Sequence, residues 1–488
     1  MRSFNLFVVA VAALPLLGLA CSDDDGDKPG PSTGGSSATG GSSGASGGSG
    51  GATGGSSGAC GGNGGATGGN GGSGGATGGN GGDAGSAGEG GGTACDIYDP
   101  DLPRETVPQP LGGDFSLTRD KAWFLDGVTY VAAGETLTIE PCTRIEGRVD
   151  SSNWGALVVS RGGRILAEGT ADEPIVFTSE LPPGSRAMGD WGGVVLLGRA
   201  SNFSGDDVLI EGLPDQPVNQ YGGDDDEDDS GVLKFVRIEF TGIEISPGNE
   251  INGLTLGSVG SGTVIENVMV TKTTDDGIEL FGGTVDLMNV IGNNVGDDIF
   301  DADQGWRGSL VNAFGRQGTT PQTGPVSEDP NGFEMDSHLG GNTPVTDVTA
   351  TNVTLCGDNE AGSFVGYGMV LRENLTGTFS NIVVAGFDAA VDVRDDFGTA
   401  DMPNVTIASS LFDEAAPIAI DSMDNDMGFD EEAWFAEGDG NTHGELPFTI
   451  EQCLAADGPS AEVLGSGVGA FADGDDWIQG AWVSWATE

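Results

Sequence analysis

The sequence is poor in basic residues. Its 488 residues include 18 Lys or Arg against 75 Asp or Glu, which gives a formal net charge of −57. Nucleic acids and anionic membrane surfaces are bound through clusters of Lys and Arg, so this composition argues against either as a partner. The excess of carboxylates favours solubility and repulsion at a cell surface. It also permits binding of Ca²⁺, which prefers carboxylate oxygens.

Histidine is scarce as well. His338 and His443 are the only two in the chain, and neither lies in a cluster of other metal-ligating or nucleophilic residues. A zinc site and a Ser-His catalytic pair therefore have little support in the sequence.

Long apolar runs are absent except at the N-terminus, where residues 4–20 follow a single basic residue, Arg2. This pattern predicts an export signal and not a membrane-spanning helix. Residues 1–21 are typical of a lipoprotein signal peptide in which Cys21 becomes the lipidated N-terminus, although Gly18-Leu19-Ala20 also suits an ordinary signal peptidase. We expect a lipid-anchored protein at the outer membrane or cell surface of a bacterium, with the anchor as its only membrane contact. Secretion is the alternative.

Residues 22–94 contain very few apolar side chains. The segment is rich in Gly, Ser, Thr and Asn, and GGATGGNGG occurs in it at 64–72 and again at 74–82. A segment with so little to bury is predicted to be a disordered linker. Such a flexible chain would hold a folded body away from the membrane.

Cysteine usage agrees with export. Apart from Cys21 and Cys60, which lies in the linker, four cysteines fall in the folded part. In an oxidising compartment these four can form disulfides, and the simplest pairing is Cys95–Cys142 and Cys356–Cys453.

Short segments of alternating apolar and polar residues dominate residues 95–420, with no convincing helical period, which predicts an all-β fold. An asparagine recurs just inside one strand, often at intervals of 22 or 23 residues: Asn267, Asn289, Asn312, Asn352, Asn381 and Asn404. That period predicts a right-handed parallel β-helix in which stacked asparagines hydrogen-bond from coil to coil. We assign residues 95–420 to this solenoid. Residues 421–488 are assigned to its C-terminal cap, with a tryptophan-rich tail folded over the last coil.

A second row of the same period is acidic. Asp275, Asp276 and Glu279 recur as Asp297, Asp298 and Asp301, each 22 residues later. The strand then continues as EMD (334–336), VLR (370–372) and DVR (392–394). Strand alternation places Leu280 and its equivalents inward, with Glu279 stacked on Asp301 and Phe281 on Asp303. The candidate metal-binding carboxylates are Asp275, Asp276, Glu279, Asp297, Asp298, Asp301, Asp303, Glu334 and Asp336.

Three interpretations of these carboxylates stay open. Coils lie about 4.8 Å apart, so stacked carboxylates repel each other unless they are protonated or bridged by a cation such as Ca²⁺. They can instead be solvated turn residues, with Arg372 and Arg394 as charge neutralisers in pairs such as Asp336–Arg372. The third interpretation is catalysis. By analogy of fold, Arg372 and Arg394 beside Ca²⁺ would act as in a polysaccharide lyase, or Glu279 and Glu334 as the carboxylate pair of a glycoside hydrolase. The acidic run at 224–229 is expected to be a solvated loop, and loose Ca²⁺ binding is its alternative interpretation.

Several motifs together resemble a known family. FLDGVTYVAAGETLTIEP (124–141), DDGIELFGGTV (275–285), GDDIFDADQGW (296–306) and NGFEMD (331–336) are similar to those of uncharacterised bacterial surface or outer-membrane lipoproteins. That resemblance implies a parallel β-helix and a surface location, and it supplies no catalytic residues. We therefore expect a surface module that binds polysaccharide or another extended polymer with Ca²⁺, or has a structural role. The alternative is a polysaccharide lyase or glycoside hydrolase.

Overall fold

The computed structural model describes residues 95–486, apart from 247–248, 319–329, 339–340, 359–365, 395–403 and 421–427. The predicted signal peptide with Cys21 and the predicted linker with Cys60 lie outside the described residues. Within the described part, no helix is both long and apolar enough to cross a lipid bilayer.

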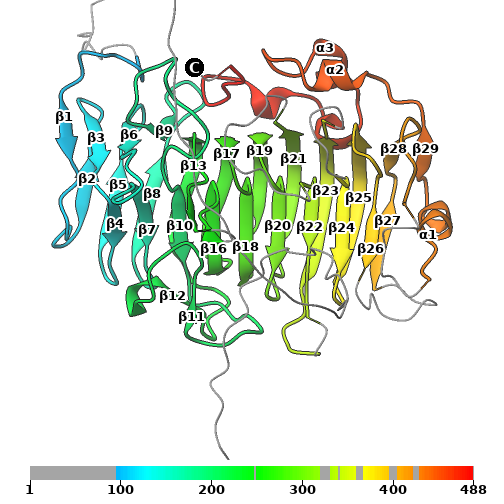
Figure 1. The fold of residues 1–488 in the computed structure, drawn as a ribbon, viewed down its shortest axis with the longest axis horizontal. Coiled ribbons are helices and arrows are strands. Elements are labelled where there is room, and N and C mark those ends of the chain that lie inside the picture. Colours follow the sequence, from blue (N-terminus) through cyan, green and yellow to red (C-terminus); the bar gives the residue numbers. More distant parts are fainter. Residues whose placement is uncertain are drawn as a thin grey trace, which may run out of the picture. The chain divides into compact units, whose positions relative to one another are not determined.

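Two parallel sheets form the walls of a solenoid (Figure 1). The path of the larger sheet is β1 (Arg104–Thr106), β3 (Ala122–Leu125), β6 (Arg144–Gly147), β9 (Ile175–Ser179), β13 (Gly231–Glu239), β17 (Val264–Thr273), β19 (Leu287–Val295), β21 (Ser309–Gln317), β23 (Asp347–Cys356), β25 (Thr376–Ala385), β28 (Leu411–Asp413) and β29 (Thr442–Gly444). Off this path it also contains β2 (Phe115–Leu117), β5 (Thr136–Ile139), β8 (Arg164–Glu168) and β27 (Val405–Ala408).

The second sheet carries the candidate site. Its order is β26 (Asp392–Arg394), β24 (Met369–Arg372), β22 (Phe333–Met335), β20 (Phe300–Asp303), β18 (Ile278–Gly283), β16 (Leu254–Val259), β10 (Val194–Leu197), β7 (Ala156–Val159) and β4 (Val128–Val131). Two short antiparallel pairs lie outside both sheets: β11 (Val208–Leu209) with β12 (Gln220–Tyr221), and β14 (Glu244–Ser246) with β15 (Asn249–Glu250). The parallel sheets confirm the all-β parallel β-helix.

A sharp bend divides the long strands of the larger sheet. The bend residue has a positive φ in every coil from β13 to β25, for example near +52° at Phe235, +56° at Asn267 and +59° at Asn352. Asparagine tolerates this left-handed conformation better than most residues. The side-chain amide of Asn352 donates to Oδ1 of Asn312 over 3.0 Å, and that of Asn381 donates to Oδ1 of Asn352 over 2.8 Å. The predicted asparagine ladder is therefore confirmed for this part of the row.

Asn404 does not belong to the ladder, and its assignment was wrong. It precedes β27, where Val405 pairs with Gly377 and Ala408 pairs with Ser380. Ser409 follows next, with a φ of +54°, and takes the bend position opposite Asn381. The interval of 23 residues to Asn404 matched the period without matching the register.

One hydrophobic core runs through the interior of the coils. The predicted inward row of Leu280, Ala302, Met335, Leu371 and Val393 is buried in it. Phe333 packs between Phe300 and Phe379, with ring centroids 6.0 and 6.1 Å away. These inward side chains fix which faces of β18–β26 point outward, because neighbouring residues of a strand point to opposite sides.

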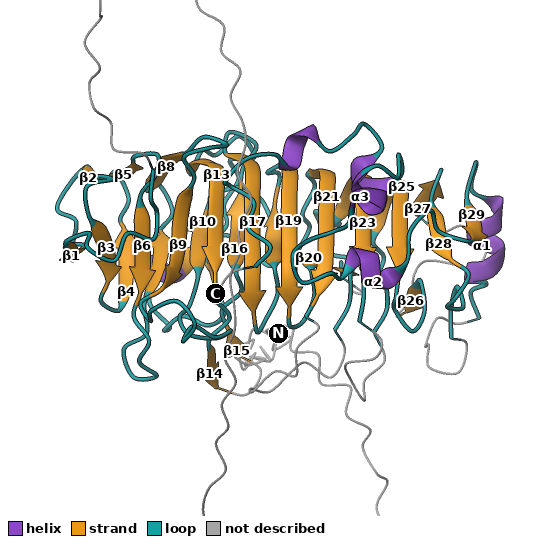
Figure 2. Cartoon of the chain, turned by 90° about the horizontal axis from the view of Figure 1, so that it is seen from above, coloured by secondary structure: helices purple, strands orange, loops and turns teal. Residues whose placement is uncertain are grey.

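The C-terminal region makes two different contacts with the solenoid (Figure 2). Helix α1 (Glu431–Glu437) lies at the β29 end, where Phe435 stacks on Phe412 with centroids 4.1 Å apart. The helices α2 (Ile450–Cys453) and α3 (Ala461–Leu464) and the tail lie on the flank of the larger sheet. Trp482 packs on Phe235, and its backbone N–H donates to Ala171 O. The tail therefore runs back along the flank, and the prediction that it folds over the last coil was wrong. The larger sheet also continues past residue 420, through the pairing of β28 with β29.

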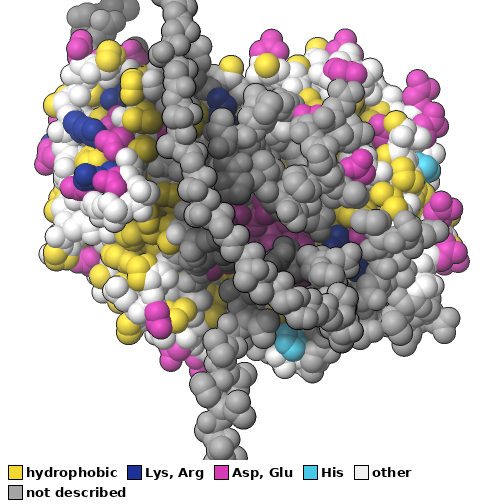
Figure 3. Space-filling model, in the orientation of Figure 1, with side chains coloured by type: hydrophobic (Ala, Val, Ile, Leu, Met, Phe, Trp, Pro, Cys, Tyr) yellow, Lys and Arg dark blue, Asp and Glu magenta, His cyan; other side chains and the backbone are white. Residues whose placement is uncertain are grey.

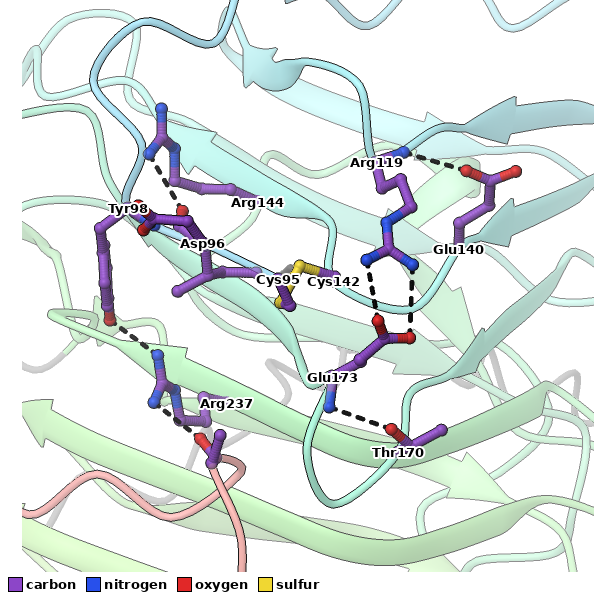
Figure 4. Close-up of a disulfide and its surroundings, with 12 residues drawn as sticks. Cys95, Asp96, Tyr98, Arg119, Glu140, Cys142, Arg144, Thr170, Glu173 and Arg237 are labelled. Atoms are coloured by element: carbon purple, nitrogen blue, oxygen red, sulfur yellow. Dashed lines mark hydrogen bonds and ion pairs between the residues drawn. A yellow bond between two sulfur atoms is a disulfide. The ribbon is translucent and has the colours of Figure 1, made fainter. Parts of the chain in front are cut away.

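The two expected disulfides, Cys95–Cys142 and Cys356–Cys453, are both present. Figure 4 shows the first of them beside a node that joins distant segments. Arg237 of β13 donates to the Tyr98 hydroxyl over 2.8 Å and to Ala481 O over 3.1 Å. The start of the folded body, a central strand and the tail are thus held together at one point of the flank.

Candidate functional site

The outward carboxylates of β18, β20 and β22, with those of the turns before them and Asp336 directly after β22, form an acidic face. We use this name for the nine carboxylates Asp275, Asp276, Glu279, Asp297, Asp298, Asp301, Asp303, Glu334 and Asp336. Glu279 pairs in register with Asp301, and Asp301 pairs with Glu334. Phe281 pairs with Asp303. The stacking that the sequence predicted on these strands is therefore confirmed. Figure 3 shows acidic side chains gathered near the middle of the face seen in Figure 1.

Three groups of carboxylates on this face come close enough to share a cation. The groups are Asp275–Asp276–Asp297, Asp276–Glu279–Asp301 and Asp298–Asp301–Glu334. Within each group, one oxygen from each residue lies within 4.8 Å of the others. Because the groups share members, they form a continuous ribbon of oxygen ligands across three coils.

Two of the turn carboxylates also have a structural role. The backbone N–H of Asp298 donates to Oδ1 of Asp276 over 3.0 Å, and that of Asn331 donates to Oδ1 of Asp298 over 2.6 Å. The N–H of Tyr367 then donates to Oδ1 of Asn331 over 3.0 Å. Asp276, Asp298 and Asn331 thus form a second side-chain ladder, in which each residue binds the backbone of the next coil. This part of the acidic face agrees with the turn-residue interpretation.

The negative charges of this face lie close together. Burial, reinforced by Glu211 and Glu250, raises the pKa of Asp275 well above its usual range. Burial, reinforced by Glu211 and Asp301, does the same to the pKa of Glu279, and burial with Asp275 and Asp298 raises the pKa of Asp276. Desolvation and like charge both disfavour the ionised carboxyl. The face is therefore stabilised either by protons or by a cation.

Three polar residues of this site were missed by the sequence analysis. Glu211 lies in the segment between β10 and β13, Glu250 ends β15, and Asn252 follows it. The side-chain amide of Asn252 hydrogen-bonds the Glu279 carboxylate and lies 3.5 Å from Glu211 Oε1. None of the three belongs to a repeated strand, so the period of the sequence gave no signal for them.

At the β22–β26 end, arginines neutralise the acidic row. Arg372 Nε lies 2.5 Å from Asp336 Oδ1, and its Nη2 lies 2.9 Å from Glu334 Oε1. The predicted Asp336–Arg372 pair is therefore confirmed. Arg372 is only 8% exposed, so it is not the accessible base that a lyase would require. Arg394 is half-buried and pairs with Asp392 over 2.7 Å.

A loop that we call the lid, residues 202–222, covers the outer face of β7, β10 and β16. Its Ile210 and Tyr221 pack on an outward apolar cluster that includes Val195, Leu197 and Phe281. Arg161 closes the neck of the lid, because its Nη1 donates to Gly222 O over 2.9 Å and to Asp206 O over 2.5 Å. The lid thereby places Glu211 beside the first carboxylates of the acidic face.

The acidic run at 224–229 was expected to be a solvated loop, but two of its side chains make specific contacts. The Asp226 carboxylate accepts from the backbone N–H of Ser201 over 2.9 Å and pairs with Arg307 over 3.0 Å. Asp228 is buried and accepts from Arg199 Nε over 2.8 Å. The run therefore fastens the base of the lid to the neighbouring coils.

One of three comparisons with known proteins, the match to a family, agrees with this architecture. The pectate-lyase-like beta helix domain family matches residues 111–444. No curated protein matches the chain significantly. Among solved structures, the catalytic domain of a GH87 alpha-1,3-glucanase in complex with tetrasaccharides is 13% identical, with 63% of this chain and 68% of that chain covered and a TM-score of 0.23. The family match spans more than half of the sequence, and the chain belongs to the pectate-lyase-like beta helix domain family.

Proposed function

We propose that this protein is a cell-surface β-helix that binds a polysaccharide through Ca²⁺ held on the acidic face. The observation that carries the proposal is the set of three overlapping carboxylate groups on consecutive coils. The family to which the chain belongs is described as pectate-lyase-like, and this favours a polysaccharide as the polymer.

The chemistry of the ligands fits Ca²⁺. All members of the three groups are carboxylates, without His or Cys, and hard oxygen ligands of this kind suit Ca²⁺ and not Zn²⁺. The charge is also uneven along the face. Arg372 and Arg394 neutralise its β22–β26 end, whereas Glu211 and Glu250 add negative charge beside Asp275. A cation is therefore most useful around β18 and β20, where it would lower repulsion and offer free coordination positions to sugar oxygens.

The location of the protein belongs to the same proposal. A signal ending at Cys21 and a glycine-rich linker would anchor the β-helix by lipid at the bacterial outer membrane or cell surface. Two disulfides suit such an oxidising compartment. Mass analysis of the mature N-terminus tests this, because a Cys21→Ser variant should lose the lipid and be released into the medium. An unlipidated wild-type N-terminus would favour the secreted alternative.

A catalytic alternative rests on one geometric observation. Glu279 and Glu334 lie two strands apart in register, which corresponds to about 9–10 Å and to the upper edge for an inverting glycoside hydrolase. A lyase is less well supported, because Arg372 is buried between two carboxylates. We therefore place binding first and hydrolysis second.

One experiment separates these functions. The full chain is titrated with Ca²⁺ by calorimetry and then tested with polygalacturonate, alginate and neutral glucans, with Ca²⁺ or with EDTA. Retention that requires Ca²⁺, without new reducing or unsaturated ends, is the expected result. New reducing ends that a Glu279→Gln variant no longer produces would establish the hydrolase instead. Absence of both Ca²⁺ binding and polymer binding would overturn the proposal.

A further inference from the structure

A second feature of the same outer face lies on the far side of the lid from the acidic face. Tyr130 and Val128 point outward from β4, and Trp154 stands just before β7. All three are half-buried and pack against the outward apolar cluster, which includes Val158. We call these three side chains the aromatic platform. Figure 3 shows apolar side chains on this face to one side of the acidic ones.

The platform shares a row of the sheet with the acidic face. Tyr130 pairs in register with Val158, Val158 with Val195, and Val195 with Thr255, which pairs with Glu279. Four strand spacings separate Tyr130 from Glu279, or about 19 Å. The intervening Val158 and Val195 are fully buried in the cluster that the lid covers. The platform is therefore a distinct surface and not an extension of the carboxylates.

The rings of the platform are fixed in place. Burial raises the pKa of Tyr130, and the side chain of Asn219, in the lid, is close enough to the Tyr130 hydroxyl to oppose that shift. Trp154 lies over the backbone before β10, where a Cβ added at Gly192 would come within 3.2 Å of its ring. The Trp154 Nε1–H forms no hydrogen bond with any residue that the structure describes, and this nitrogen is not buried. A rigid apolar ring with a donor still to be satisfied is suited to an amphipathic ligand.

Planar polar groups lie next to the platform. The Asp126 carboxylate accepts from the Asn153 side-chain amide over 3.2 Å and from the Arg148 guanidinium. Asp126 precedes Val128 by two residues, and Asn153 adjoins Trp154. The side chains of Arg148 and Asp126 remain 34% and 44% exposed, so both can still bind a ligand. Such groups bind neighbouring hydroxyls, while the apolar face of a sugar ring stacks on an aromatic side chain.

The size and charge of the platform narrow the choice of ligand. Even if they were fully accessible, the two aromatic rings would offer at most about 500 Å², which is well below the roughly 800 Å² per partner of a stable protein interface. The net charge of −57 disfavours a polyanion where no bridging cation is held. A neutral sugar ring meets both conditions.

We propose that Tyr130 and Trp154 form a second saccharide subsite, which takes a pyranose residue of a neutral polysaccharide without a metal ion. Trp154 is the stacking side chain, and its Nε1–H donates to a ring hydroxyl. Asp126, Asn153 and Arg148 bind the remaining hydroxyls of that residue. The subsite does not depend on the acidic face, so it can hold neutral polymers even when Ca²⁺ is removed.

The test is affinity electrophoresis of the full chain in gels that contain a neutral β-1,3-, β-1,4- or α-1,3-glucan, all in EDTA. The wild type should be retarded by at least one of these glucans, and Trp154→Ala should weaken that binding by roughly tenfold, the equivalent of about 1.4 kcal/mol. Trp154→Phe keeps a stacking ring and should retain most of the binding. Met288→Ala is the matched control, because Met288 is an apolar side chain 47% exposed on the other sheet.

Each outcome tests whether the subsite exists, independently of the calcium proposal. Wild-type binding in EDTA that falls in Trp154→Ala but not in Met288→Ala supports the subsite, whether or not Ca²⁺ binds elsewhere. Polymer binding that appears only with Ca²⁺, or that is equal in Trp154→Ala and wild type, overturns the subsite and leaves the acidic face intact. Matched circular dichroism spectra of Trp154→Phe and Trp154→Ala exclude misfolding as the cause of a loss.

Discussion

The raised pKa values of the acidic face predict that thermal stability without Ca²⁺ falls as pH rises, and the proposed Ca²⁺ site predicts that Ca²⁺ offsets this fall. The pKa values of Asp275, Asp276 and Glu279 are raised in the folded protein above their ordinary values of 3.8 for Asp and 4.5 for Glu. Between the ordinary and the raised values, the folded state therefore binds more protons than the unfolded state. Stability from these groups is fully present below about pH 4 and is lost as pH rises through the raised pKa values.

In EDTA the Tm should thus fall as pH is raised above about 4. Ca²⁺ competes with protons for the same oxygens, so it should stabilise the protein at pH 7.5 and have little effect at pH 4. One Ca²⁺ site, with free Ca²⁺ at 100 times its Kd, adds about 2.7 kcal/mol to the free energy of unfolding. The unfolding entropy is about 2.1 cal/mol/K per residue, or about 0.8 kcal/mol/K over roughly 390 folded residues. Dividing the stabilisation by this entropy gives a rise in Tm of about 3 °C.

The assay is differential scanning calorimetry of the wild type, Glu279→Gln and Asp172→Asn across this pH range. Each substitution removes one negative charge, but Asp172 is exposed and distant in sequence from the acidic face. Glu279→Gln should flatten the pH profile in EDTA and reduce the Ca²⁺ effect, whereas Asp172→Asn should do neither. The reasoning is refuted if the profile in EDTA is flat, or if Ca²⁺ stabilises the protein equally at pH 4 and pH 7.5.

Three further predictions concern the framework of the site, each measured by urea unfolding. Asn352→Ala should cost about 2–4 kcal/mol, because it removes two ladder hydrogen bonds and strains a positive φ. Asn352→Gly should cost less, because glycine adopts a positive φ without strain. Asn404→Ala, outside the ladder, should cost under about 0.5 kcal/mol. Equal costs for Asn352→Ala and Asn404→Ala would contradict the register. Arg372→Met should cost about 3–5 kcal/mol by removing the guanidinium that pairs with two buried carboxylates, and a loss below about 1 kcal/mol would show that the arginine neutralises nothing. Reduction of Cys356–Cys453, which closes a sequence separation of 97 residues, should cost about 4–5 kcal/mol if the chain-entropy account holds, and an unchanged midpoint would exclude it.

The sequence predicted those features that repeat with the coil. In a solenoid, one inward column and one outward column recur in every turn, so Leu280 and Ala302, or Glu279 and Asp301, could be aligned by spacing alone. The same method failed at Asn404, because that coil takes 28 residues from the bend at Asn381 to the bend at Ser409. Spacing gives the register only where no residues are inserted between the strands.

The features that do not repeat could not be predicted in this way. Glu211 reaches the acidic face from the lid, which is a single insertion of 21 residues with its own antiparallel pair. Trp154 reaches the aromatic platform from the segment before β7 and packs on a cluster that includes Ile210 and Tyr221 of the lid. The tail is placed by long-range contacts such as Asn267 to Trp477 O, which no local pattern encodes. Loops of this kind decide which outward columns are covered and which can meet a ligand.

The outward columns of the two sheets also show why the acidic face requires a chemical explanation. On the larger sheet, Ser309, Thr349, Thr378 and Thr406 stack in register, so coil stacking does not itself demand charge. A row of hydroxyls at about 4.8 Å spacing carries no repulsion, whereas a row of carboxylates at that spacing does unless protons or cations offset it. Arg372 supplies that offset at one end of the face, through its pairs with Glu334 and Asp336. At the other end the lid brings in Glu211 and increases the repulsion. This arrangement raises negative charge where hydroxyls would suffice, and that is the feature for which we propose a bound cation.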